Sequence, residues 1–398
     1  MQGFPDNFWW GTTQSATGAE GAAPASDWSL FERSGRAQGS SDGNGFATNY
    51  RDDFEMLATA GLRHIRLTVE WARLEPTPGR YDSDAVEHYR HVFEAAAEAG
   101  IAAWATLHNT SLPGWFADDE RGFRDPRSRS YFWPRHVDFV AEQLDGLVAG
   151  WSPIEDPVGW ALRGFQLGSR PPGRSGDSGV LVDAIEGALE ASRIAWELLR
   201  GGRQPVMGVF GLPPIRAVRP EAEQDAQRWH DLVWSSWVGA IRDGEFRIPG
   251  KGFRERSDWV GAFDYIGLAI RNPVAVEADD TLVPWPVDGR VDGTGFAPNP
   301  DQDAQVLRDL AEQLPGKPLV IASHGVATDD DRWRDDIVKA TVHQLKDALA
   351  DGVPLHGYFH DTAIDGYGWL NGFEQPTGLF DRNRNPKPSA TWLTAQLA

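Results

Sequence analysis

Short apolar segments alternate with amphipathic helical segments along the whole 398-residue chain, and this alternation predicts a single (β/α)8 barrel of the α/β class. The strand-like segments number eight, which is the count of a closed TIM barrel. No glycine-rich phosphate loop follows the first of them, so the main alternative, a doubly wound open sheet, is disfavoured. No polar linker divides the chain, and we expect one domain over residues 1–398.

The expected strands are short runs of apolar and β-branched residues, each followed by polar or glycine residues. They lie at residues 8–14, 64–69, 101–107, 147–154, 206–210, 263–268, 318–322 and 354–359. Helices are recognised by an apolar stripe at helical spacing: residues 49–61 place Phe54, Leu57 and Ala58 on one face and stop at Gly61. Further helices are expected at 84–100, 181–200, 221–242 and 331–352, and loops rich in Pro and Gly at 170–179 and 284–300.

Composition excludes several classes of partner and chemistry. A net charge of −20 opposes binding to nucleic acid and to anionic membranes, because both require a basic surface. The absence of cysteine excludes thiol nucleophiles and thiolate metal sites. The first residues show no secretory signal and no apolar run is long enough to span a bilayer, so we expect a soluble, cytoplasmic protein. The sequence does not determine its oligomeric state.

Polar and ionisable residues gather where the expected strands end. In a (β/α)8 barrel these positions meet at one face and form the active site. They are His108 and Asn109 after the third strand, Glu155 and Asp156 after the fourth, Arg271 after the sixth, Ser323 and His324 after the seventh, and His360 and Asp361 after the eighth. Each residue alone has a structural explanation, but the whole set favours a functional site for a small molecule.

The motifs of the chain resemble those of glycoside hydrolase family 1, the β-glucosidase family of retaining enzymes. The resemblance runs in order from residue 4 to residue 392 and implies a (β/α)8 barrel that handles carbohydrate. It is carried by FPDNFWWG at 4–11, HIRLTVEWARLEP at 64–76, TLHNTSLP at 106–113, WSPIEDPVGWALRGFQLGSRPPG at 151–173, DYIGL at 264–268, GYFHDTAIDGYGW at 357–369 and NRNPKPSATW at 383–392.

The departures from the family pattern fall on its sugar-binding and catalytic positions. By this resemblance the attacking glutamate of the T-E-N-G motif is replaced by Ser323, and the Asn-Glu pair of the N-E-P motif by Glu155 and Asp156. The strand-3 histidine becomes Asn109 and the strand-8 tryptophan becomes Asp361, whereas Arg66 and Trp369 match the family. The scaffold is therefore retained while the sugar-gripping surface is replaced.

Retaining hydrolysis requires two carboxyl groups about 5–5.5 Å apart, one of which attacks the sugar. Ser323 cannot replace that carboxylate without a base, so the family's covalent route is disfavoured. We expect Asp156 to be the acid, Glu155 a base or hydroxyl partner, and Ser323 and His324 to orient substrate. A triad of Ser323, His360 and Asp361 is disfavoured because neighbours on one strand point to opposite sides.

By the same resemblance, the attacking carboxylate of the family contacts a strand-2 arginine, here Arg66, and a strand-6 tyrosine, here replaced by Arg271. This chain lacks that carboxylate, so two cations remain without it. An unpaired buried cation is costly. We therefore expect either an internal partner (Glu155, Asp361 or Glu70) or an anionic group of the substrate to neutralise these charges. We expect an enzyme that acts on a sugar-like or polyhydroxylated small molecule by a non-standard acid/base route. The alternatives are a ligand-binding pseudoenzyme and an ordinary or inverting β-glycosidase.

No metal or other cofactor is expected. His108, His324 and His360 with Glu155 or Asp361 could supply zinc ligands, but no H-x-H or H-E-x-x-H spacing supports such a site.

Overall fold

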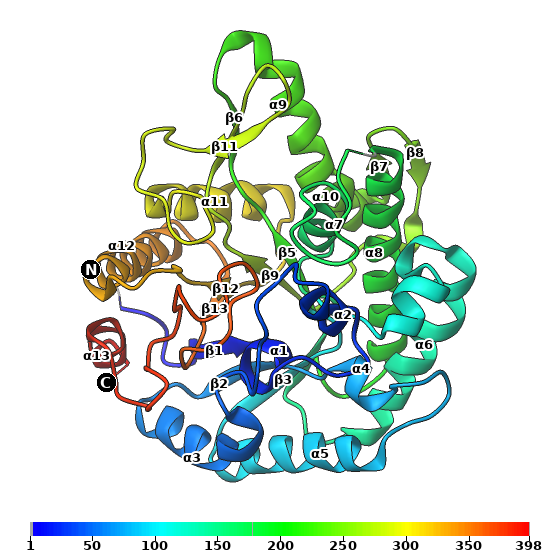
Figure 1. The fold of residues 1–398 in the computed structure, drawn as a ribbon. Helices are drawn as coiled ribbons and strands as arrows, with labels where there is room; N and C mark the ends of the chain where they lie inside the picture. The colour runs from blue at the N-terminus through cyan, green and yellow to red at the C-terminus, as the bar shows by residue number, and fades with distance from the viewer. Residues whose placement is uncertain (1–2, 177, 398) are drawn as a thin grey trace.

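Eight parallel strands form the centre of the molecule in the computed structural model, which describes residues 3–176 and 178–397 (Figure 1). In the sheet they follow the order β4-β3-β2-β1-β13-β12-β9-β5. The strands are β1 (Trp9–Gln14), β2 (His64–Thr68), β3 (Ala102–Thr106), β4 (Gly150–Ser152), β5 (Met207–Gly211), β9 (Tyr265–Ala269), β12 (Leu319–His324) and β13 (Leu355–Asp361). Each overlaps one of the strands that the sequence predicts.

The sheet closes on itself between its two edge strands. Parallel bridges join Trp151 to Val206 and Glu155 to Val209, and so connect β4 to β5. Because closure removes the exposed edges of a sheet, every strand has a neighbour on both sides. The predicted (β/α)8 barrel is confirmed.

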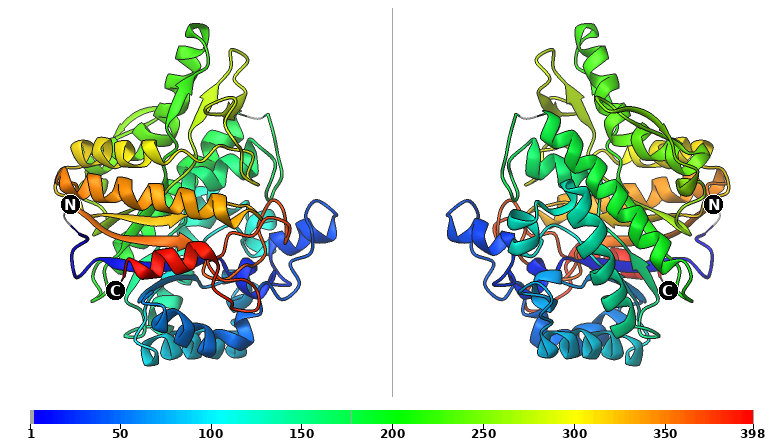
Figure 2. Two further views of the ribbon diagram at one scale, coloured as in Figure 1. Left: turned by 90° about the vertical axis from the view of Figure 1, so that its left-hand side faces the viewer. Right: turned by 90° about the vertical axis from the view of Figure 1, so that its right-hand side faces the viewer.

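Helices surround the barrel on its outer side (Figure 2). The predicted helices at 49–61, 84–100, 181–200 and 331–352 correspond to α3 (Phe46–Thr59), α5 (Ser83–Glu98), α8 (Ser178–Leu199) and α12 (Asp331–Ala350). Further helices lie outside the predicted ranges: α1 (Ala16–Glu20), α2 (Asp27–Arg33), α4 (Trp71–Leu74), α6 (Pro126–Gln143), α7 (Pro157–Phe165), α11 (Asp303–Gln313) and α13 (Pro388–Ala395).

The single helix predicted at 221–242 is interrupted. It consists of α9 (Glu223–His230), a π-helical turn at Asp231–Ser235 and α10 (Ser236–Asp243). Near α9, the strands β6 (Ile215–Ala217), β10 (Val274–Val276) and β11 (Leu282–Pro284) form a small sheet, and together they make the projection at the top of Figure 1. A hairpin of β7 (Glu245–Ile248) and β8 (Gly252–Glu255) follows α10.

The barrel interior changes from apolar to polar toward the carboxyl ends of its strands. Its apolar cluster consists of Trp104, Met207, Val209, Ala269, Val320, Ala322 and Phe359, all buried. Beyond this cluster Arg66, Ser152 and Ser323 are also buried, but they are polar. Because apolar packing excludes water from the lower barrel, polar chemistry is confined to the carboxyl end.

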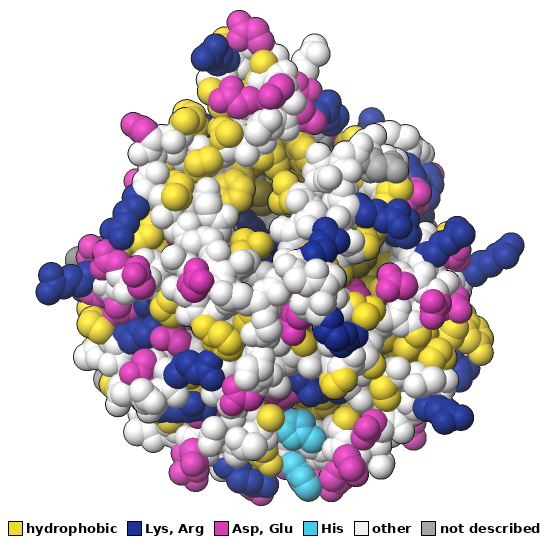
Figure 3. All heavy atoms as spheres, in the orientation of Figure 1, with side chains coloured by type: hydrophobic (Ala, Val, Ile, Leu, Met, Phe, Trp, Pro, Cys, Tyr) yellow, Lys and Arg dark blue, Asp and Glu magenta, His cyan; other side chains and the backbone are white. Residues whose placement is uncertain are grey.

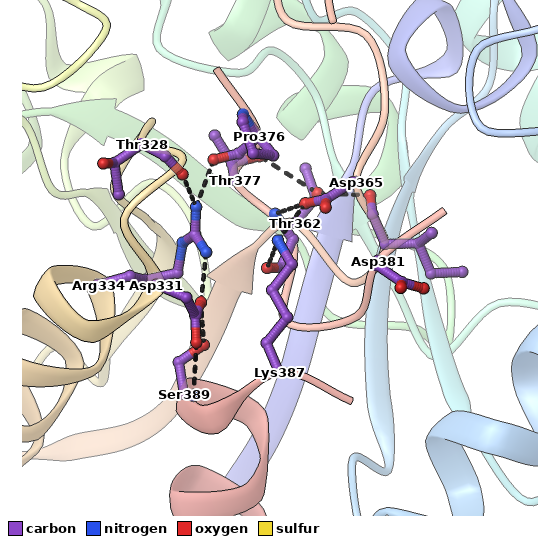
Figure 4. Close-up of polar contacts among 12 residues, drawn as sticks. Thr328, Asp331, Arg334, Thr362, Asp365, Pro376, Thr377, Asp381, Lys387 and Ser389 are labelled. Atoms are coloured by element: carbon purple, nitrogen blue, oxygen red, sulfur yellow. Dashed lines mark hydrogen bonds and ion pairs between the residues drawn. The ribbon is translucent and has the colours of Figure 1, made fainter. Parts of the chain in front are cut away.

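The loop that follows β13 is tied to two helices by a buried polar network (Figure 4). The Arg334 guanidinium, on α12, donates to the carbonyl oxygens of Thr328 and Pro376 and pairs with Asp331. Lys387, just before α13, donates to Asp365 at 2.6 Å and so holds the loop from the other side. The network fixes the segment that carries the end of β13 into the site.

We predict that Arg334→Met lowers the free energy of unfolding by about 3 kcal/mol, because it leaves buried carbonyl oxygens and Asp331 without their cationic donor. Urea denaturation measures this loss, and hydrogen exchange of residues 362–378 should become faster. Arg332→Met is the matched control, since Arg332 lies on the same helix and is exposed. An equal effect of the two substitutions would contradict the assigned role of Arg334.

Candidate functional site

The carboxyl ends of the strands bring together charged side chains from distant parts of the sequence. Arg66 comes from β2, Glu155 follows β4, Arg271 follows β9, and Asp361 ends β13. Figure 3 shows a hollow near the centre of this face, walled by hydrophobic side chains, with basic atoms deep within it. The structure therefore brings these predicted site residues into one cluster.

Arg66 is fully buried at the base of the cluster and is neutralised internally. Its Nη2 atom lies 2.5 Å from Glu155 Oε2, and its Nη1 atom donates to the Ala322 carbonyl oxygen at 2.7 Å. The hydroxyl oxygens of Ser152 and Thr106 accept from Nη2 at 3.3 and 3.4 Å. Of the internal partners and the substrate anion that the sequence left open for Arg66, the structure selects Glu155.

Glu155 links the two predicted anion-binding arginines. One carboxylate oxygen faces Arg66, and the other lies 3.9 Å from Arg271 Nη2. Its backbone N–H donates to the His108 carbonyl oxygen at 2.8 Å, which fixes the backbone beneath the side chain. Glu155 thus contacts two guanidinium groups at once.

Asp156 caps helix α7 and is saturated with donors. Its Oδ1 atom accepts from the backbone N–H groups of Gly159 and Gly211, both at 3.0 Å, and its Oδ2 atom lies 3.3 Å from Arg163 and from Arg271. Burial raises the pKa of this carboxyl, but the two arginines and the N–H donors lower it by more, so the net shift is downward. A carboxylate held ionised in this way is a poor proton donor, which argues against the predicted acid role.

Asp361 is in the opposite electrostatic situation. Burial is the largest influence and raises the pKa of its carboxyl, and nearby Glu155 acts in the same direction. Arg271 and the Ser323 hydroxyl, which donates to Asp361 Oδ2 at 3.2 Å, offset only part of this rise. The pKa of Asp361 is therefore shifted toward the protonated form, in the opposite direction to that of Asp156.

Arg170 and Trp369 form the rim of the same cluster. The Arg170 guanidinium lies 5.2 Å from the centre of the Trp369 ring and donates to Thr110 Oγ1 at 2.6 Å. The Thr110 hydroxyl in turn donates to Asn109 Oδ1 at 2.9 Å. Trp369 meets Trp28 edge to face at 4.7 Å, so its ring is fixed. The predicted residues Asn109 and Trp369 are thus linked through Thr110 and Arg170.

Sequence reasoning missed Arg163 and Arg170. Arg163 follows Asp156 by seven residues, which is two helical turns along α7, and this spacing was the available signal. Arg170 lies in the irregular segment after that helix, where no periodicity indicates the direction of a side chain.

His108 is not in the cluster, contrary to the prediction that it binds substrate. It is 2 % exposed, and its ring packs edge to face on Phe123 and Trp160. Burial lowers the pKa of the imidazole to about 3, so the ring is neutral. His108 is a core histidine of the layer outside the barrel.

His324 and His360, which were predicted to contact substrate, point away from the cluster into the layer outside the barrel. His324 Nδ1 lies 2.8 Å and His360 Nδ1 lies 3.2 Å from the Tyr358 hydroxyl. Their Nε2 atoms face the Thr341 hydroxyl at 3.4 Å and the Thr377 carbonyl oxygen at 3.2 Å. Alternation along the strands turns Ser323 and Asp361 inward and these histidines outward.

These contacts form a continuous buried chain, which we call the outer chain: Asp303, Thr341, His324, Tyr358, His360 and Thr377. The Thr377 carbonyl oxygen can only accept, so neutral His360 must donate to it and accept from the Tyr358 hydroxyl. The same counting makes His324 donate to Tyr358 and accept from Thr341. The single hydroxyl hydrogen of Thr341 is then used in its bond to His324. Asp303 must therefore be protonated and donate to the Thr341 oxygen to complete the chain. Burial raises the pKa of Asp303 to about 8, in agreement with this assignment.

Within residues 3–176 and 178–397, no group of His, Cys, Asp and Glu side chains has an arrangement that could hold a metal ion. The same part of the chain contains no helix that is long and apolar enough to cross a membrane.

The whole sequence can now be compared with known proteins. Residues 1–234 and 296–397 match the model of glycosyl hydrolase family 1. The chain belongs to this family. The match omits residues 235–295, and this segment carries β9 and Arg271.

Family 1 relatives cover the chain almost completely at low identity. Beta-glucosidase 2 of Oryza sativa subsp. japonica is 24 % identical, over 98 % of this chain and 91 % of its own. The cyanidin 3-O-glucoside 7-O-glucosyltransferase (acyl-glucose) of Delphinium grandiflorum is 23 % identical, over 98 % and 89 %. The beta-glycosidase from Pyrococcus horikoshii superposes with a TM-score of 0.90 at 25 % identity, over 99 % of this chain and 95 % of that one.

We predict that Asp303→Asn stabilises this family 1 protein at alkaline pH. The raised pKa means that the folded state binds a proton that the unfolded state releases near pH 4, so wild-type stability falls as pH rises from about 4 to 8, by at most about 1.4 kcal/mol per unit. The amide group of asparagine can donate to Thr341 without taking up a proton from solvent. The free energy of unfolding of the variant should therefore not fall over this pH range. Urea denaturation from pH 4 to 9 tests it, with Asp309→Asn on the same helix as control. Parallel wild-type and D303N curves would contradict the assignment.

We predict that Glu155→Gln lowers the free energy of unfolding by about 3 kcal/mol, because it leaves the charge of Arg66 buried without a carboxylate. The control is Glu98→Gln, which breaks the surface pair with Arg51, where both side chains are more than half exposed. That substitution should cost less than about 1 kcal/mol. A similar loss in both variants, measured by urea denaturation, would sink the claim that the Arg66–Glu155 pair anchors the site.

Proposed function

We propose that this chain is a family 1 enzyme that acts on a sugar-like or polyhydroxylated small molecule without forming a covalent glycosyl–enzyme intermediate. The observation that carries the proposal is the Ser323–Asp361 contact, which stands where the family resemblance places the attacking carboxylate. The family membership and the barrel supply the expectation of a carbohydrate-like substrate.

Within residues 3–176 and 178–397, no histidine is hydrogen-bonded to Ser323, whose side chain contacts Asp361. The nearby histidines, His324 and His360, point away from it into the outer chain. A serine hydroxyl requires an adjacent general base to attack carbon at neutral pH. Ser323 is instead a donor that positions Asp361.

Asp361 is the proposed acid, in place of Asp156. Burial raises its pKa, which is the direction that suits a group giving a proton to a leaving oxygen. Glu155, held by Arg66 and Arg271, is the proposed ionised partner that accepts a proton from water or from a substrate hydroxyl. The two carboxyl groups thereby differ in environment, since arginines pair with Glu155 and burial dominates at Asp361, and such a difference is the usual basis for dividing acid and base roles.

A ligand-binding protein without catalysis is the second candidate. The specific observation in its favour is that Asp156 and Glu155 are both occupied by internal arginines. In that case Asp361, Asn109 and Arg271 would hold hydroxyl groups of a ligand without reacting with it.

We predict that incubation with activated 2-deoxy-2-fluoro-β-glycosides leaves no covalent adduct on the wild-type protein, because Ser323 stands at the attacking position and the neighbouring Asp361 is proposed to act as the acid. Intact-mass measurement detects such an adduct directly. Ser323→Glu is the matched control: it restores a carboxylate at the attacking position, and a sugar adduct should form there. A stoichiometric adduct on the wild-type chain would overturn the non-covalent route.

We predict that turnover of a panel of aryl β-glycosides falls as pH rises through the raised pKa of Asp361, because the proton donor is lost. Asp361→Asn should reduce kcat by about 10²-fold or more and abolish this alkaline fall. Ser323→Ala should keep kcat within about tenfold. Turnover like that of an ordinary β-glucosidase, abolished by Asp156→Ala, would contradict the proposal. Sugar binding with no turnover at any pH would favour the ligand-binding candidate.

A further inference from the structure

The cluster at the carboxyl end of the barrel contains more guanidinium groups than carboxyl groups. Its carboxyl groups belong to Glu155, Asp156 and Asp361, and its guanidinium groups to Arg66, Arg163, Arg170 and Arg271. Even with every carboxyl group ionised, the cluster keeps a positive charge, although the whole chain carries −20.

Arg170 is the arginine of this cluster whose charge is not neutralised by direct contact with a carboxylate of the described residues. Its side-chain hydrogen bond goes to the neutral hydroxyl of Thr110, and no carboxylate of residues 3–176 and 178–397 pairs with it. Its Nε atom is buried and has no partner within the same residues. Burial and the nearby charges of Arg163 and Arg271 lower the pKa of Arg170, and the more distant charges of Asp156 and Asp361 offset only part of this effect.

The carboxylates of the cluster are already engaged elsewhere. Both oxygens of Asp156 are occupied by two N–H groups and two arginines, and both oxygens of Glu155 face Arg66 and Arg271. Asp361 accepts from Ser323. Pairing Arg170 with Asp156 or Glu155 would take a carboxylate away from another arginine, and pairing it with Asp361 would break the contact with Ser323, so we infer that a ligand supplies the missing charge.

The unbalanced side of the cluster is the side nearer to solvent. The Arg66 side chain is 0 % exposed, whereas Arg163 and Arg271 are 22 % and 29 % exposed and Arg170 is half-buried. The basic atoms within the hollow of Figure 3 agree with this arrangement. A ligand that enters the hollow therefore meets guanidinium groups before it meets Arg66.

We propose that Arg170, together with Arg271, binds an oxyanion group of the ligand, a carboxylate or a phosphate, so that the substrate is an acidic sugar derivative. This inference rests on the proposed function for the sugar-like character of the ligand. The planar guanidinium fork matches carboxylate and phosphate oxygens, and partial burial strengthens the attraction. The Trp369 ring lies beneath the Arg170 guanidinium, 5.2 Å from ring centre to guanidinium carbon, and restricts its position before the ligand arrives.

Calorimetric titrations of the full chain with D-glucose, D-glucuronate, glucose 6-phosphate and inorganic phosphate test the proposal. We expect at least one acidic sugar to bind about tenfold or more tightly than glucose, and the better of the two identifies the anion as carboxylate or phosphate. Arg170→Met should remove this preference while glucose binding stays within about threefold. Arg200→Met is the matched control, because Arg200 also lies over a tryptophan, Trp196 at 4.9 Å, but at the far end of α8. It should change nothing.

The outcomes separate the two proposals. Glucose binding with no preference for acidic sugars, or a preference that survives in R170M, overturns the anion site and leaves the sugar site standing. Binding of inorganic phosphate that is lost in R170M, without binding of any sugar, supports the anion site and counts against the sugar-like substrate. Absence of binding by every probe overturns both. Circular dichroism and thermal denaturation confirm that R170M is folded, so that a loss of binding is not a loss of structure.

Discussion

The buried guanidinium of Arg66 is the constraint on which the upper barrel depends. A cation inside a closed barrel has no water to solvate it, so it must find a carboxylate and carbonyl oxygens nearby. Glu155 and the Ala322 carbonyl oxygen fill this need. Because Glu155 is used in this way, it also draws Arg271 toward the barrel axis, and Arg271 in turn joins Arg163 on Asp156. One desolvated charge therefore organises the site across β2, β4 and β9.

This organisation changes what the carboxyl groups can do. Each guanidinium that stabilises an ionised carboxylate makes that group a weaker acid, so Asp156 is a cap and charge partner. Asp361 is desolvated without such full compensation and can hold a proton. Membership of glycosyl hydrolase family 1 is clear from the chain as a whole, yet the chemistry proposed here differs because charge pairing, and not the scaffold, sets the protonation states.

The layer outside the barrel contains two polar networks of its own. The outer chain from Asp303 to Thr377 satisfies two buried histidines and a tyrosine with neutral groups, and the network around Arg334 and Lys387 holds the loop after β13. Both systems lie on the far side of the strands from the charged cluster. They keep β12 and β13 in place, so that Ser323 and Asp361 face inward with little freedom.

The sequence by itself determined the fold and the approximate places of all eight strands, because apolar periodicity and strand-ending residues are local features. It also placed Arg66, Glu155, Arg271, Ser323 and Asp361 at one end of the barrel, because parallel strands carry their carboxyl ends to one face. Only the tertiary structure decided which neighbours face inward: His360 and Asp361 are adjacent, yet one belongs to the outer chain and the other to the site. Only it could show that Arg163 and Arg170 join the cluster and that Asp156 is saturated with donors. Protonation depends on burial and on partners brought together through space, and no local pattern in the sequence encodes those distances.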